Sequence, residues 1–168
     1  MANQREDRWL KGSHNATKCY NRGMSLTTLL WVRVAHVLGF VLWSSGLLTG
    51  IFLLRAHASV EASARQALVP IEKVVGIIMD AGATIAMAAG FVFAFSTTPI
   101  AFKTGGWLHM KLTLVVVGVL SVHGMVRVKM RKYRNGDVSP LPSWVLPVLL
   151  VCLAAIIALG ANPTLLRK

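Results

Sequence analysis

Several ionisable side chains lie inside long apolar runs of this sequence. The set is Arg33, His36, Asp80, His109, Lys111 and His123. Apolar runs of about 20 residues are typical of helices that cross a membrane. A charged or titratable group within such a helix is energetically costly. These residue types therefore predict a buried pair of charges, a proton path or a bound cofactor.

Helical geometry sorts these residues by face. At 100° per residue, Arg33 and His36 lie on one stripe of the first helix. His109, His123 and Arg127 share a stripe of the third helix within about 40°, whereas Lys111 lies about 200° away from His109. We therefore expect the third helix to present two different chemical faces.

Depth along the helices selects a pair of histidines. His36 lies about 8 Å and His109 about 11 Å towards the N-terminal side of their runs, and the first and third helices of a four-span protein run parallel. Neutral imidazoles from two helices are a common way to hold haem iron in a bundle. We predict His36 and His109 as metal ligands, with His123 as the alternative second ligand.

Cationic residues near this pair are candidate partners for haem propionates. Arg33, Arg127 and Lys111 fit that role because a charge-assisted contact with a carboxylate is strong in a dry site. Two other interpretations stay open. A single histidine can be a hydrogen-bonded structural residue, and Asp80 with His123 can be a buried ion pair.

Composition supports a membrane protein. The 168 residues are 55% hydrophobic and 14% charged, with 18 Lys and Arg against 6 Asp and Glu. Soluble domains carry about a quarter charged residues, so this chain lies well below them. The basic residues flank the apolar runs, where they meet anionic lipid, and we expect membrane lipid and not nucleic acid as the partner.

The apolar runs predict an all-α membrane protein, a bundle of four transmembrane helices. We expect a polar basic tail at 1–26 and a membrane domain at 27–168, with spans near 29–54, 71–95, 107–126 and 144–161. The pair Gly46 and Gly50 leaves room for a neighbouring helix or for a flat macrocycle, and the first is the commoner use. Homo-oligomerisation stays open.

Alternative functions follow from other residues. Methionines and histidines are soft ligands, so a copper or small-solute transport subunit is one alternative. Its candidate ligands are Met79, Met87, Met110 and Met125. A haem-bearing or anchoring subunit of a larger respiratory complex is another. The sequence has no phosphate-binding GxxxxGKS loop, no HExxH and no GxSxG, which argues against soluble nucleotide or hydrolase chemistry.

Three stretches resemble the HemJ-type protoporphyrinogen IX oxidases. They are AHVLGFVLWSSGL at 35–47 with Arg55-Ala56-His57 downstream, GGWLHMKLTL at 105–114, and VHGMVRVKMRK at 122–132. The copper-resistance D-type membrane proteins share a looser version of the first pattern. The sequence departs from the family at Thr49-Gly50-Ile51-Phe52 and at Ser139-Pro140-Leu141-Pro142.

The resemblance implies a haem b-binding enzyme of a bacterial cytoplasmic (inner) membrane. Its substrate would be a porphyrinogen, which it would oxidise from protoporphyrinogen IX to protoporphyrin IX. His36 would be an axial haem ligand, and Lys111 would be a catalytic residue near the haem or the substrate. His57, His109 and His123 also occupy positions of the family's motifs.

Overall fold

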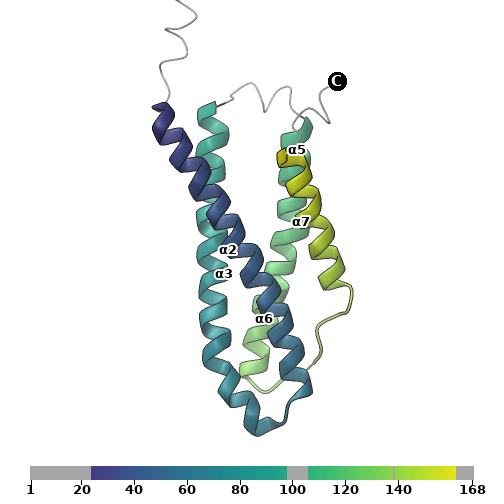
Figure 1. The fold of residues 1–168 in the computed structure, drawn as a ribbon. Helices are drawn as coiled ribbons and strands as arrows, with labels where there is room; N and C mark the ends of the chain where they lie inside the picture. The colour runs from purple at the N-terminus through teal and green to yellow at the C-terminus, as the bar shows by residue number, and fades with distance from the viewer. Residues whose placement is uncertain (1–23, 98–105, 138, 162–168) are drawn as a thin grey trace, which may run out of the picture.

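The structure, a computed structural model, describes residues 24–97, 106–137 and 139–161, which form a bundle of helices (Figure 1). The elements are α2 Leu26–Ser59, α3 Ala62–Thr97, α5 Gly106–Thr113, η1 Leu114–Leu120, α6 Ser121–Arg134 and α7 Val145–Ala161. Because α5, η1 and α6 follow one another without a break, the bundle has four helical rods. The predicted all-α four-helix architecture is confirmed, and nearly all of the predicted tail 1–26 lies outside the described residues.

Three of the rods are long and apolar enough to cross a membrane. They are Leu26–Ser59, Ser63–Ser96 and Leu108–Arg134, whereas α7 has 17 residues. A bilayer core needs about 20 residues, with a lower limit near 17, so α7 is at the short end of that range. The long helices extend beyond the apolar runs of the sequence, and α3 continues through Pro70. His57, which follows the first apolar run, therefore lies within α2.

The helices α2 and α3 pack closely because glycines face each other along their seam. A Cβ at Gly39 would lie 2.5 Å from the backbone nitrogen of Ala86, and one at Gly82 would lie 2.5 Å from that of Trp43. Gly46 lies against the Cα of Met79 in the same way. The glycines of this seam thus serve helix packing, which is the commoner of the two uses expected from the sequence.

The third rod contains a π-helical segment, η1, between Thr113 and Ser121. π-helical turns are rare, hold more residues than α-helical turns and are frequent at functional sites. The residues before and after η1 therefore do not keep the angular relation of a continuous α-helix. Within η1, Gly118 lies against Cys152 of α7, which packs α7 onto the third rod.

Local sequence explains where α2 begins and where α6 ends. Ser25 caps α2 by accepting a hydrogen bond from the Thr28 amide at 3.2 Å. Gly136, with a φ of 88°, ends α6 in the turn that Asn135-Gly136-Asp137 predicts. Because the four rods alternate in direction, the start of α2 and the end of α7 lie at the same end of the bundle (Figure 1).

Candidate functional site

A cavity of about 220 Å³ lies between the α2–α3 pair and the other two rods. All four rods contribute to its wall, and the polar side chains there include His36 of α2 and Lys111 of α5. The remaining lining residues are mostly apolar, such as Phe40, Met87 and Ile156. Pockets for small molecules commonly measure about 300–1,000 Å³, so a macrocycle would require the two halves of the bundle to move apart.

His36 is held in the cavity wall by its backbone surroundings. Its Nδ1 lies 2.7 Å from the carbonyl oxygen of Ala86. A carbonyl only accepts, so Nδ1 donates and Nε2 carries the lone pair of the neutral ring. The ring packs on Gly90, where an added Cβ would lie 2.9 Å from Cε1 and Nδ1. A histidine whose first nitrogen donates to a backbone carbonyl while the second is unprotonated has the arrangement typical of metal-ligating histidines.

Lys111 reaches the same cavity from α5. Its Nζ lies near Gly160 of α7, 4.0 Å from the position of an added Cβ. The side chain is half-buried, and apolar residues make up most of the surrounding wall. An ammonium group in such a wall can bind a carboxylate strongly, because water competes weakly there.

Two other predicted site residues lie outside this wall. Arg33 and His109 are both exposed on the helix surface, and neither lines the cavity. His109 lies two residues before Lys111 on the α-helical turn of α5, so the two side chains point in roughly opposite directions. The structure therefore brings His36 together with Lys111 and not with His109.

The expected common stripe of His109, His123 and Arg127 depended on 100° per residue throughout the third helix. The segment η1 separates His109 from the other two residues and removes that assumption. In the structure His109 is exposed, while His123 is half-buried against α2. The prediction of one shared stripe is wrong for this reason.

His123 belongs to a hydrogen-bonded chain across three helices. The Trp43 indole donates to His123 Nδ1 at 2.9 Å, and His123 Nε2 lies 3.2 Å from Asp80 Oδ1. Arg127 Nη2 lies 2.9 Å from Asp80 Oδ2, and its guanidinium fits over Gly76. The predicted pairing of Asp80 with His123 is present, although Asp80 is 44% exposed rather than buried. Both ring nitrogens of His123 are thus engaged by protein atoms.

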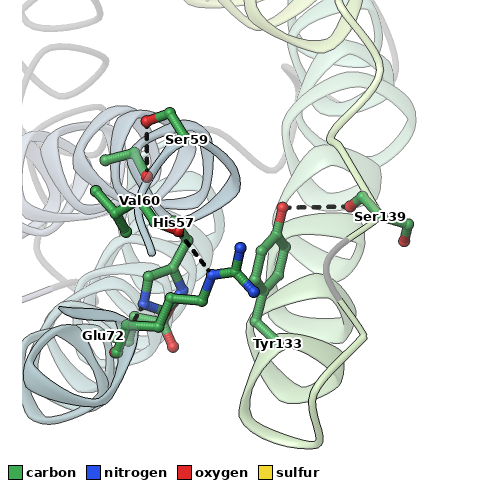
Figure 2. Close-up of polar contacts among 8 residues, drawn as sticks. His57, Ser59, Val60, Glu72, Tyr133 and Ser139 are labelled. Atoms are coloured by element: carbon green, nitrogen blue, oxygen red, sulfur yellow. Dashed lines mark hydrogen bonds and ion pairs between the residues drawn. The ribbon is translucent and has the colours of Figure 1, made fainter. Parts of the chain in front are cut away.

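A second polar cluster lies near the end of the bundle where α2 turns into α3 (Figure 2). His57 and Glu72 are 2% and 1% exposed, and Nδ1 of the histidine lies 2.7 Å from Oε1 of the carboxylate. His57 Nε2 donates to the carbonyl of Arg65 at 3.2 Å, and the ring stacks on Tyr133 at 5.3 Å. The sequence suggested His57 only as a family position near the interface, because its apolar run ends before it.

Some of the buried polar atoms in that cluster lack a well-aligned hydrogen bond. The contact between His57 and Glu72 lacks the alignment of a hydrogen bond, and Glu72 Oε2 has no hydrogen-bond partner among the described residues. Tyr133 donates to the Ser139 carbonyl at 3.3 Å, and Lys129 contacts the same carbonyl at 3.1 Å. The cluster therefore ties α2, α3, α6 and the segment before α7 together. Within the described ranges, no three His, Cys, Asp or Glu side chains gather in a way that could hold a metal ion.

Comparison with known proteins gives one informative similarity. The chain is 32% identical over 117 residues to the protoporphyrinogen IX oxidase of Synechocystis sp., which covers 64% of this chain and 53% of that protein. The chain thus spans about half the length of this curated bacterial relative. No protein-family model matches the chain, and no solved structure matches it. The apolar helices and this similarity together indicate a membrane protein distantly related to a porphyrin-biosynthesis oxidase.

Proposed function

We propose that this chain is a haem b-binding membrane oxidoreductase that oxidises protoporphyrinogen IX to protoporphyrin IX in a bacterial inner membrane. The observation that carries the proposal is the meeting of His36 and Lys111 in one apolar cavity. The similarity to the cyanobacterial oxidase supports the same reaction. A metal-binding nitrogen and a carboxylate-binding ammonium suit a ligand that has an iron centre and propionate arms.

The donor set of the cavity fits haem, and His36 is the ligand that this proposal assigns. Its Nδ1–H is fixed by Ala86, so its Nε2 would bind the iron. Haem, when bound, supplies one-electron redox chemistry. His123 has both nitrogens engaged, and a bond from His109 would require α5 to rotate, so both are weaker candidates for a second ligand.

Lys111 would act on the propionates and not on the iron. Its ammonium would neutralise a propionate of the substrate or of haem and so hold the macrocycle in one orientation. The apolar wall around it, formed by residues such as Phe40 and Val115, would exclude water from the reacting ring. Arg33 and Arg127 lie elsewhere on the bundle and would not share this role.

Spectroscopy and turnover of the same sample test the proposal. The purified protein, reduced with dithionite, should show a haem b spectrum, and membranes that contain it should convert protoporphyrinogen IX into fluorescent protoporphyrin IX. Membranes with the Lys111→Met variant serve as the matched control for turnover. A colourless protein that binds Cu(I) would contradict the proposal and support the copper-transport alternative.

A further inference from the structure

The ion pair of Asp80 and Arg127 lies on an outer face of the bundle. Asp80 is 44% and Arg127 is 36% exposed, and neither lines the cavity described above. On α3, Ile77 and Thr84 share the exposed stripe of Asp80 within about 60°. This face, formed by Ile77, Asp80 and Thr84 of α3 with Gly124 and Arg127 of α6, is called the α3–α6 face below.

The pair also lies at membrane depth. Asp80 is at the middle of the span Ser63–Ser96. Arg127 directly follows the apolar run 107–126, and its side chain reaches back towards the span through its contact with Asp80. Arg127 cannot easily extend towards water while its guanidinium binds Asp80 over Gly76. Lipid chains offer no hydrogen bonds to these half-exposed groups, so a protein surface is the better cover.

The charges of the α3–α6 face indicate which protein surface covers it. The face carries one carboxylate and one guanidinium side by side, so a two-fold axis through it would set each Arg127 against Asp80 of the other copy. A guanidinium has five N–H donors, and its ion pair with Asp80 is made through Nη2, which leaves donors for a second carboxylate. Gly124 adds room, since no described atom lies within 4 Å of an added Cβ there. Small residues at such positions let helices approach closely.

We propose that the α3–α6 face binds a second copy of this chain in the membrane, in a two-fold pair joined by reciprocal Arg127–Asp80 contacts. This proposed dimer does not depend on haem binding or on porphyrinogen oxidation. The reciprocal contacts use Asp80 and Arg127, which do not line the cavity of either copy.

Cysteine crosslinking in native membranes tests the geometry without altering the charges. In a Cys19→Ser background, Gly124→Cys should form a disulfide-linked dimer on mild oxidation. Val151→Cys, which is 69% exposed on α7, is the matched control and should stay monomeric. Efficient crosslinking at Val151 with none at Gly124 would overturn the proposal.

Charge exchange tests the reciprocal contact. Copies that carry Asp80→Arg have two positive charges on the face, and copies that carry Arg127→Asp have two negative charges. When two differently tagged forms are produced together, mixed pairs should exceed like pairs at least about tenfold. Copies with Lys132→Asp, in the last turn of α6, and copies with Asp137→Arg, in the turn after it, are the control and should give no preference. Equal amounts of mixed and like pairs, or a wild-type chain that is monomeric in lipid nanodiscs at all concentrations, would contradict the proposal.

Discussion

Two polar regions of this bundle use histidine in different ways. His36 and Lys111 both line the cavity, and His36 donates a hydrogen bond from Nδ1 to a backbone carbonyl, which makes Nε2 the unprotonated nitrogen of the neutral ring. Near the α2–α3 turn, His57 is buried with Glu72, and both ring nitrogens contact protein atoms. His123 resembles His57 in this respect, since Trp43 and Asp80 engage its two nitrogens.

The number of engaged ring nitrogens distinguishes a histidine that can bind a ligand from one that stabilises the fold. A histidine with one engaged nitrogen is oriented but still able to bind a ligand, whereas one with both engaged is committed to holding helices together. The cavity should therefore control cofactor and substrate, and the His57–Glu72 cluster should control the stability of the helix hairpin. Substitutions in the two regions should thus have different readouts.

The largest expected effect is on stability at the His57–Glu72 cluster. Glu72→Ala leaves the buried His57 without its charged partner, and removal of one member of a buried pair costs about 3–5 kcal/mol. Thermal unfolding in detergent should show this loss. The same change at exposed Glu61 is the control and should stay within about 0.5 kcal/mol of the wild type. Equal effects at the two positions would mean that the cluster is not a structural tie.

A smaller effect is expected where Gly90 supports the ring of His36. An added methyl group in Gly90→Ala would lie 2.9 Å from the imidazole, so the ring must move away from Ala86. Overpacking of this kind costs about 1–3 kcal/mol, and we expect weaker haem retention as well. Gly106→Ala, which has no described atom within 4 Å, should leave haem retention unchanged. Full haem retention in Gly90→Ala would show that the contact between Gly90 and the His36 ring is not needed for haem binding.

Lys111→Met should change turnover and not stability. Loss of the ammonium group should lower oxidation of protoporphyrinogen by at least about tenfold, or about 1.4 kcal/mol in the barrier, with the haem spectrum retained. Lys132→Met, in the exposed last turn of α6, provides the control for loss of a positive charge. Unchanged turnover in Lys111→Met would mean that this side chain extends to the interface and takes no part in the reaction.

The smallest effect concerns Asp137 in the turn after α6. Hydrogen bonds from the amide and the side chain of Ser139 hold the pKa of Asp137 below 3.8, the usual value for an aspartate, and the charges of Lys132 and Lys129 act in the same direction. Because the folded pKa is lowered, the stabilisation is present above pH 3.8 and is lost as pH falls through the folded value. The difference in unfolding temperature between wild type and Asp137→Asn should shrink in that range. A difference that is constant with pH would rule out this contribution.

The sequence predicted much of the fold because its signals are local. Apolar runs identified four helices, and α6 ends before Asn135-Gly136-Asp137, a sequence typical of turns. His36 and Lys111 were both selected, since ionisable groups stand out in an apolar run. Their meeting in one cavity was not predicted, because it depends on how the α2–α3 pair packs against α5 and α7.

Two other features of the site could not be derived from residue spacing. The segment η1, with its sequence LVVVGVL, carries no pattern that separates it from an ordinary apolar helix, and it changed the faces of His109 and His123. The His57–Glu72 pair joins a residue of α2 that follows its apolar run, 29–54, to a residue at the start of the next run, 71–95. The continuation of α2 beyond its apolar run places His57 opposite Glu72.

Replacement of His36 by asparagine tests the central claim most directly. His36→Asn keeps an N–H donor at the position of Nδ1, which bonds Ala86, but removes the imidazole Nε2, so it separates the hydrogen bond from metal binding. We predict that His36→Asn inserts and folds but lacks the reduced haem b spectrum, while His109→Asn and His123→Asn retain it. Full haem occupancy in His36→Asn would contradict the assignment of His36 as the haem ligand.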